Sequence, residues 1–488
     1  MTNSTSDEKA PVSGALAGGG VAPNAASEPL HLQFFRFLER IEMRRGVVWA
    51  ALIVALSAEL ISFFFAATWY DWWMRRFTYL SENPFALGSQ NIDFPEHRLR
   101  ILGPVIAWAL GLRGVIGTLV PVAANVPILM TVYVVVRRRT SLPVAVVSTL
   151  LLATTHVTMT SRTLLGYHDS LVFLCLLGAM LCRSWWASSS TFFLALFGDV
   201  RAVLVVPFLI AWRLVDQPPE RPFRWFVSRL LMYLLVFAVW TVLAIWLAHQ
   251  LQAMDDWWSG TRSHLLGEKL SGLQPFYVHL SASMTFKSAW VFPFILCWIW
   301  SRRRKWIMVM TLLSALLIGA ASLLVTDLSR ALTFLFPLVI MGIIELWRVD
   351  GPKCLTVVST CLLVNLITPF FHGMTERLWV CHYPLPFELA TGNWQPAIAL
   401  SGFLGLSLLM ALFTRWMSAD PPSPYLRQQN QDASELDRRA RLWSVGYVFG
   451  LAAAVLAAAA YRFLASLDDF WLDEIWSWLI VTDRKSVV

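Results

Sequence analysis

The sequence predicts an all-α polytopic membrane protein with about eleven to thirteen transmembrane helices. Of its 488 residues, 57% are hydrophobic and only 14% are charged, whereas soluble domains carry about 25% charged residues. The charged residues gather in short clusters between long apolar runs, and many of these runs approach the ~20 residues that cross a bilayer. This composition excludes a cytosolic enzyme, a disordered scaffold and a secreted disulfide-rich protein.

The segment before the first expected span has two parts. Residues 1–28 are rich in Ser, Ala, Gly and Pro and contain too few large apolar side chains to fold, so we expect a disordered tail. They also lack the pattern of a signal peptide. Residues 29–46 include HLQFFRFLERIEMRR, whose aromatic and basic side chains predict an interfacial helix on an anionic cytoplasmic leaflet.

The apolar runs place a transmembrane domain at 47–416, a cytoplasmic linker at 417–442 and an extra span with an acidic outer tail at 443–488. The run 101–112 is too short to cross the bilayer and predicts an interfacial or re-entrant helix. The polar stretch GDVR interrupts 185–215 and predicts a hairpin of two short helices there. The expected spans are 47–69, 115–136, 143–160, 164–182, 226–249, 287–301, 306–325, 331–347, 354–371, 396–416 and 443–465.

The basic clusters predict the orientation through the positive-inside rule. Arg36, Arg40, Arg44 and Arg45 favour a cytoplasmic N-terminus. Alternation, with the hairpin at 185–215, then keeps the later clusters cytoplasmic: Arg137-Arg138-Arg139, Arg183, Arg213 to Arg229, Arg302-Arg303-Arg304-Lys305, Arg348 with Lys353, and Arg415 to Arg441. The net charge of +8 therefore reflects the basic cytoplasmic loops of a multi-pass membrane protein, and we expect no nucleic-acid partner.

The same topology gathers the mixed Asp, Glu, His and Arg residues at the outer ends of the helices. Polar groups within apolar segments are costly and usually functional. A transporter would place such groups at the membrane midplane, between broken helices. The outer position instead favours an active site that faces the exterior and receives a lipid-borne substrate from the side.

The first outer loop contains QNIDFPEHRLRILGP, where Asp93 is the candidate general base for an acceptor hydroxyl. Glu96 and His97 are further catalytic candidates. The alternative is that this carboxylate caps a helix N-terminus. Arg98 and Arg100 are candidate phosphate ligands because guanidinium groups offer a planar fork of donors, although arginines that snorkel to the interface give the same pattern.

Three other pairs are candidate substrate-binding groups. His168 and Asp169 follow Gly166-Tyr167 and open an apolar run, as a binding site or as a plain helix N-terminus. The other two pairs are Asp199 with Arg201 and Asp327 with Arg330. Asp199 and Arg201 are either a local ion pair or a phosphate-binding arginine with an orienting aspartate. Asp327 and Arg330 have i,i+3 spacing, which places both charges on one helix face. Glu59 stands alone within the first span and has no predicted partner.

The first span, the acidic outer loop and the motifs FPEHRLRILGP, GYHDSL, FGDVRA and TDLSRALTFLFP resemble the GT-C superfamily of membrane glycosyltransferases, over roughly residues 45–415. This resemblance implies a polyprenyl-phosphate sugar donor at the outer face, a carboxylate in the first outer loop that acts as base or orients the acceptor, and inversion at the anomeric carbon. SLDDFWLDEIWSWLIV near the C-terminus resembles the opening of a second such module, with Asp473 and Glu474 at its acidic pair. A helix folded back on the first module and a coincidental amphipathic tail are the other interpretations.

The expected function is therefore transfer of a sugar from a polyprenyl-phosphate donor to an acceptor at the outer face, with membrane lipids and the lipid-linked donor as partners. No ligand spacing requires a metal or other cofactor, although a divalent metal beside the acidic groups is compatible with the pattern. The alternatives are a lipid or glycan transporter or flippase, a lipid-linked glycan polymerase or ligase, and an assembly subunit whose charges serve only topology.

Overall fold

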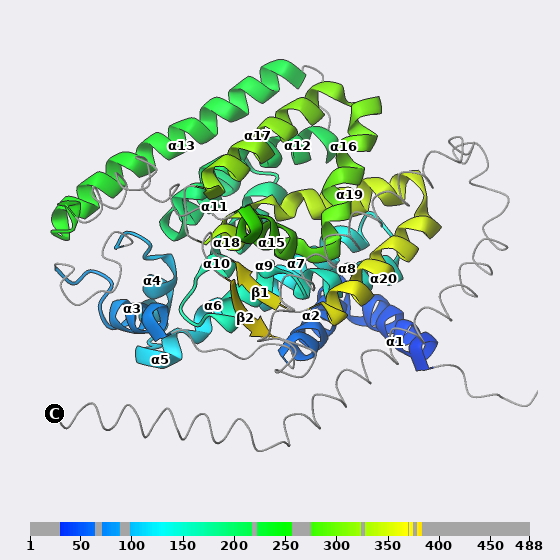
Figure 1. Cartoon of the computed structure of the whole chain (residues 1–488), viewed down its shortest axis with the longest axis horizontal. Coiled ribbons are helices and arrows are strands. Elements are labelled where there is room, and N and C mark those ends of the chain that lie inside the picture. The colour runs from blue at the N-terminus through cyan, green and yellow to red at the C-terminus, as the bar shows by residue number, and fades with distance from the viewer. Residues whose placement is uncertain are drawn as a thin grey trace, which may run out of the picture.

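The computed structural model describes residues 30–63, 71–87, 98–216, 222–255, 275–323, 327–368, 370–373 and 378–382. Helices make up nearly all of this part of the chain (Figure 1), which confirms the predicted all-α polytopic class. The described exception is a small antiparallel pair, β1 (Phe370–Gly373) and β2 (Leu378–His382). The predicted N-terminal tail, the spans at 396–416 and 443–465 and the linker between them lie outside the described residues.

Five helical stretches in the described part of the chain are long and apolar enough to cross a membrane. A bent pair, with an angle of 41° between its halves, gives a sixth if it is one span. The five are Gly114–Arg137, Phe223–Gln250, Ser281–Arg303, Lys305–Leu323 and Leu328–Val349, and the bent pair is α8 (Leu142–Ala153) with α9 (His156–Thr163). The shorter apolar helices are Val47–Ser62, Asp169–Leu181 and Gly351–Leu366.

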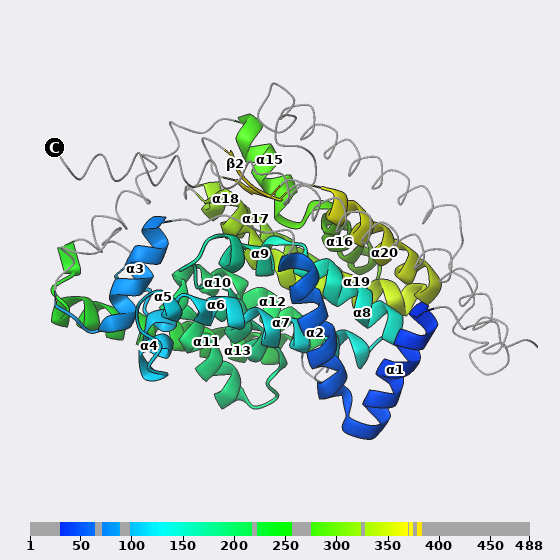
Figure 2. The ribbon, with the colours of Figure 1, turned by 90° about the horizontal axis from the view of Figure 1, so that it is seen from below.

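The first two helices, α1 (Leu30–Arg45) and α2 (Val47–Phe63), meet at a sharp angle (Figure 2). Gly46 joins them with a φ of +90°, a conformation that glycine adopts without steric cost. Helix α1 exposes aromatic and basic side chains. Its Glu42 accepts hydrogen bonds from Tyr133 at 2.7 Å and from Arg137 at 2.9 Å. These bonds tie α1 to the end of α7.

Short helical pieces follow. They are α3 (Asp71–Glu82), α4 (Leu102–Ala109), α5 (Gly114–Gly117), α6 (Leu119–Ala123) and α7 (Asn125–Arg137). Helix α4 has eight residues, about 12 Å of rise, so it is too short to cross a bilayer. The last three pieces continue one another and form the stretch that is long enough to do so.

Helix α10 (Asp169–Leu181) packs along α11 (Trp185–Gly198), and the chain then continues through η2 (Val200–Val205) into α12 (Val206–Asp216). The break falls at Asp199, as the polar interruption predicts. The Asp199 carboxylate accepts a hydrogen bond from the Arg201 backbone N–H at 2.9 Å, which caps the new helical turn. Residues 185–215 are therefore two short helical segments rather than one span.

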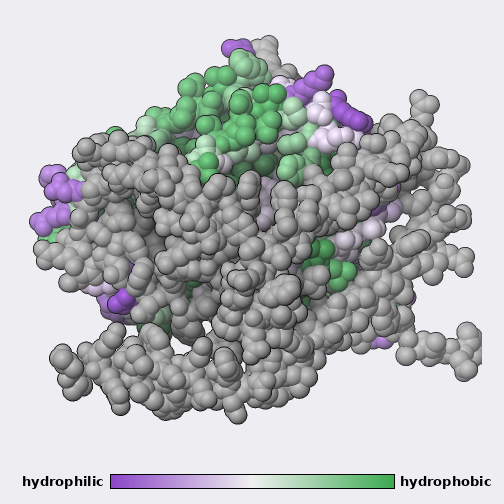
Figure 3. All heavy atoms as spheres, in the orientation of Figure 1, coloured by the Kyte–Doolittle hydropathy of each residue, from purple (hydrophilic) through white to green (hydrophobic). Residues whose placement is uncertain are grey.

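The second half of the fold begins with α13 (Pro222–Gln250), a helix of 29 residues. Only 17% of its most apolar stretch is buried. Helix α17 (Lys305–Leu323) lies near α13, and together they present an apolar surface (Figures 1 and 3). A membrane protein turns such a surface toward lipid.

The remaining elements enclose the core. They are α15 (Pro275–Phe286), η4 (Lys287–Trp290), α16 (Val291–Arg303), α18 (Leu328–Leu332), η5 (Thr333–Leu335), α19 (Phe336–Val349) and α20 (Gly351–Ile367). Buried Lys287 donates hydrogen bonds to the carbonyls of Asn365 at 3.1 Å and Thr368 at 3.0 Å. Its ammonium thereby satisfies carbonyls that the end of α20 leaves without helical partners.

Candidate functional site

Six charged side chains from four separate parts of the sequence meet at one end of the helical core. Arg100 precedes α4, Asp169 begins α10, Asp199 and Arg201 lie at the break after α11, and Asp327 and Arg330 lie at the start of α18. We refer to these six residues as the arginine–aspartate cluster. All six are among the residues that the sequence singles out, and ion pairs link them directly to one another.

Asp199 lies at the centre of the cluster and is fully buried. Its Oδ2 atom is 2.5 Å from Arg201 Nη2, 3.6 Å from Arg330 Nη2 and 3.7 Å from Arg100 Nη1. Burial would raise the pKa of Asp199, but the three guanidinium groups hold it well below its usual range. Three arginines therefore converge on one ionised oxygen.

Arg330 is the most deeply enclosed cation of the cluster, with 2% of its surface exposed. Its Nε lies 2.7 Å from Asp169 Oδ2, and its Nη1 donates a hydrogen bond to Asp327 Oδ2 at 3.2 Å. The guanidinium also stacks over the Tyr167 ring, 4.4 Å from its centroid, while the Tyr167 hydroxyl donates to Asp327 at 3.2 Å. Arg330 thus joins α10, the break after α11 and α18.

His168 is buried beside the cluster, and its Nε2 is 2.8 Å from the carbonyl oxygen of Gly198. A Cβ at Gly198 would press against Val172, so the close approach of these segments depends on glycine. Burial and the positive charges of Arg76, Arg330 and Arg100 lower the pKa of His168 to about 3. The imidazole is therefore neutral at physiological pH and donates from Nε2 to the carbonyl.

The low pKa of His168 predicts a loss of stability in acid. The unfolded imidazole takes up a proton below about 6.5, whereas the buried one stays neutral down to about 3, so falling pH favours the unfolded state over this window. We expect His168→Gln to flatten the decline in unfolding free energy between these pH values, measured by denaturant titration in detergent. His249→Gln, at an exposed position in α13, is the matched control and should keep the wild-type slope; equal slopes in all three proteins would contradict this prediction.

Arg76 of α3 is a member of the site that the sequence pattern alone does not indicate. It is buried, with 2% of its surface exposed, and lies close enough to lower the pKa of His168. The sequence does contain one indication of Arg76, because the Arg75-Arg76 pair stands between aromatic residues on an amphipathic helix. Arg76 therefore joins Arg330 and Arg100 as a third arginine whose positive charge acts on His168.

Of the four other residues predicted for this site, the structure describes Arg98 alone. Arg98 is fully buried and donates from Nη2 to the Ala86 carbonyl at 2.7 Å, so it does not snorkel to an interface. Asp93, Glu96 and His97 lie outside the described residues. Within the described ranges, no three His, Cys, Asp or Glu side chains gather as a metal site would require.

A second charged pair joins Glu59 of α2 to Arg162 of α9 by an ion pair and hydrogen bond. Both side chains are largely buried. Within the part of the chain that the structure describes, Glu59 Oε1 and Arg162 Nε and Nη1 are buried without a hydrogen-bond partner. The sequence identifies Glu59 as unusual, but it does not reveal a partner that is 103 residues away.

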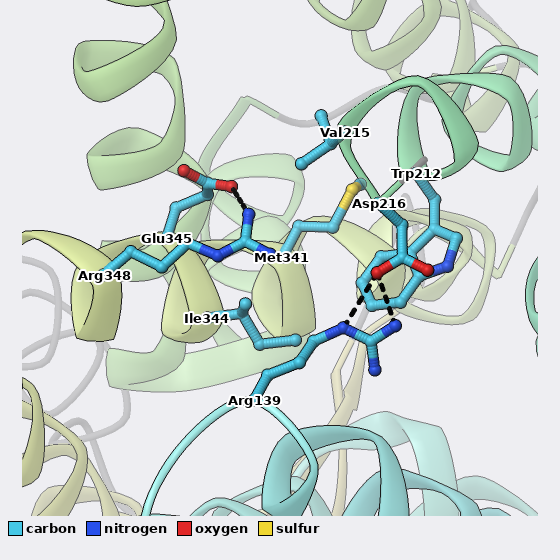
Figure 4. A pocket seen from close by; sticks show the side chains of 8 residues that line it. All are labelled: Arg139, Trp212, Val215, Asp216, Met341, Ile344, Glu345 and Arg348. Atoms are coloured by element: carbon cyan, nitrogen blue, oxygen red, sulfur yellow. Dashed lines mark hydrogen bonds and ion pairs between the residues drawn. The ribbon is translucent and has the colours of Figure 1, made fainter. Parts of the chain in front are cut away.

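The connections predicted to be cytoplasmic meet at the opposite ends of α12 and α19. Arg139 donates to Asp216 at 2.6 Å, and Arg348 donates to Glu345 at 2.6 Å in the same region (Figure 4). Arg304 also approaches Glu345, at 3.8 Å. We refer to Arg139, Arg304 and Arg348 with these carboxylates as the basic end. Basic residues that the sequence analysis expects on the cytoplasmic side therefore lie together at the basic end. This end is separate from the arginine–aspartate cluster.

The fold and this site define a polytopic α-helical membrane protein with a buried centre of converging arginines and aspartates. No protein family model, curated protein or solved structure matches the chain.

Proposed function

We propose that this protein is a membrane glycosyltransferase of the GT-C type that transfers a sugar from a polyprenyl-phosphate donor to an acceptor. In this proposal it lies in the bacterial inner membrane with a cytoplasmic N-terminus, and the arginine–aspartate cluster faces the exterior. The observation that carries the proposal is the convergence of Arg100, Arg201 and Arg330 on one point.

The arginines suit the departing phosphate of such a donor. When the bond between the anomeric carbon and the phosphate oxygen breaks, negative charge grows on the phosphate, and preorganised cations stabilise that charge. Guanidinium groups match phosphate oxygens with paired donors. Arg100 and Arg201 keep partly exposed side chains, at 19% and 13%, so they are the cluster members best placed to contact a ligand.

Asp199 and Asp169 have a positioning role in this proposal. Three guanidinium groups so close together repel one another unless an anion lies among them. The Asp199 carboxylate supplies that anion and accepts from Arg201 through both oxygens, at 2.9 and 3.1 Å. The arginines are thereby held in one geometry before the donor arrives, which lowers the cost of organising them during the reaction.

The acceptor needs a base that removes its hydroxyl proton as the oxygen attacks the anomeric carbon. Asp93 is the proposed base. It precedes Arg100 of the arginine–aspartate cluster by seven residues in the sequence.

The test is sugar transfer by purified protein with labelled polyprenyl-phosphate sugars. We expect Arg201→Gln to lower turnover by about 100-fold or more, as removal of one charge-stabilising donor does in other enzymes, and Asp93→Asn to abolish it. Arg303→Gln, an exposed arginine at the other end of the structure, should leave turnover unchanged. Wild-type turnover in Arg201→Gln would remove the cluster from the reaction.

A second candidate is a lipid transporter, which the buried Glu59–Arg162 pair favours because ion pairs within spans often mark transport pathways. The same preparation distinguishes the two candidates. Sugar transfer supports the glycosyltransferase, whereas lipid scrambling in liposomes that is lost in Glu59→Gln, with no transfer from any donor, supports the transporter.

A further inference from the structure

Helix α1 turns a row of arginines away from the helical core. Arg36, Arg40 and Arg44 follow one another at intervals of four residues, which places them on one face of the helix, and all three are exposed. We refer to these three residues as the arginine stripe. The opposite face carries Leu38, which is fully buried, and Glu42, which bonds to α7. The stripe therefore faces away from the protein.

Large apolar side chains flank the stripe on both sides. Helical geometry places Met43 on one side of it and Phe34 and Phe37 on the other. Met43 is 79% exposed, and the two phenylalanines are exposed as well. A helix face that combines arginines with exposed aromatic and other apolar side chains is typical of helices that lie in the interface of an anionic membrane.

The charges on α1 are unbalanced. The helix contains four arginines and two glutamates, and one of the glutamates, Glu42, forms an ion pair with Arg137 of α7 at 2.9 Å. Like charges four residues apart repel one another and destabilise a helix. The helix dipole compensates the arginines of the last turn, Arg44 and Arg45, but not the earlier members of the stripe. An anionic partner would therefore stabilise this helix.

The position of α1 favours a membrane as that partner. Gly46 joins it directly to the apolar helix α2, where Trp49 in the first turn is exposed, and tryptophan favours membrane boundaries. Figures 1 and 2 show α1 at the end of the molecule where α19 meets α20, which is also where the basic end lies. Glu42 holds α1 there, because its two oxygens accept hydrogen bonds from Tyr133 and Arg137 of α7. A soluble acidic partner would match the arginines, but it would leave the exposed apolar side chains in water.

We propose that α1 is a binding surface for anionic phospholipids of the adjacent membrane leaflet. The arginine stripe contacts the headgroup phosphates, and Phe34, Phe37 and Met43 enter the boundary between the headgroups and the acyl chains. The lipids cover the exposed face of the helix from outside. This surface is separate from the arginine–aspartate cluster, so the proposal stands whether or not the protein transfers a sugar.

The test is hydrogen–deuterium exchange of the α1 amides in the full-length protein, in nanodiscs of phosphatidylcholine with or without phosphatidylglycerol. Each arginine near an anionic surface strengthens binding about fivefold, so we expect phosphatidylglycerol to slow the exchange by about tenfold or more. Replacement of the whole stripe by glutamine should remove this difference. Arg302→Gln with Arg303→Gln, at exposed positions on α16, is the matched control and should keep it.

Replacement of the stripe by lysine separates lost charge from a disturbed fold, because lysine keeps the attraction to anionic headgroups. This variant should retain the slower exchange. Equal exchange of wild-type α1 in the two nanodiscs, or a glutamine variant that keeps the wild-type difference, would overturn the proposal. An equal loss in the α16 control would show diffuse attraction to the basic residues of this end and would also overturn it. Slowing of the same size by soluble polyglutamate in phosphatidylcholine nanodiscs would show a surface for acidic proteins and overturn the lipid assignment.

Discussion

Replacement of Arg330 by Met is expected to lower the free energy of unfolding by about 3–5 kcal/mol, the cost of breaking a buried ion pair from one side. The change leaves Asp169 with 1% and Asp199 with no exposed surface, and it removes the cation that contacts both of them. Reversible unfolding in mixed detergent micelles, titrated with SDS, measures the difference.

A double-mutant comparison shows whether the loss comes from the uncompensated carboxylate. Arg330→Met combined with Asp169→Leu replaces the charged partners with apolar groups, so the pair should be less destabilised than the sum of the two single variants. Additive losses, or a loss below about 1 kcal/mol in the single variant, would show that the ion pair does not hold these segments together.

Gly342→Ala is expected to cost about 3 kcal/mol, at the upper end of the usual range for overpacking. Gly342 lies where α19 crosses α16, and an added Cβ would overlap the Phe292 carbonyl oxygen and lie 2.7 Å from its carbonyl carbon. The obstacle is backbone, so a rotamer change cannot relieve it and the two helices must separate. Small residues allow such close helix contacts in membrane proteins.

Gly319→Ala is the matched control, because nothing lies within 4 Å of the position that its Cβ would take on α17. There the substitution should be neutral or should stabilise the helix by about 0.5–1 kcal/mol, since alanine loses less backbone entropy than glycine. SDS titration of both variants checks the contrast. Similar unfolding free energies for the two would contradict the close contact at Gly342.

Features set by neighbouring residues could be predicted from the sequence. The polar interruption at Asp199 predicts the break between α11 and η2. The i,i+3 spacing places Asp327 and Arg330 on one helix face, and the structure has them 3.2 Å apart. The distribution of charge also separates the groups that meet at the basic end from those in the arginine–aspartate cluster. Each of these depends on local chain geometry or on a long apolar run.

Contacts between distant segments could not be predicted. Asp169 and Arg330 are 161 residues apart, and Glu59 and Arg162 are 103 apart, so helix packing decides which charges pair. The local ion pair that would account for Asp199 and Arg201 exists, but it is one part of a larger network. The position of Lys287 at the end of α20 likewise depends on how α20 packs against η4.

The spacing of two tryptophans on the long helix α13 matches the thickness of a bilayer. Trp225 and Trp246 are 21 residues apart on this helix, which corresponds to about 32 Å of helical rise. This separation nearly equals the ~30 Å thickness of the hydrocarbon layer, and indole rings favour the two boundaries of that layer. In a thinner bilayer both rings cannot stay at their boundaries unless α13 tilts. Only 17% of its most apolar stretch is buried, so tilting disrupts little packing. The protein's response to acyl-chain length should therefore start at α13.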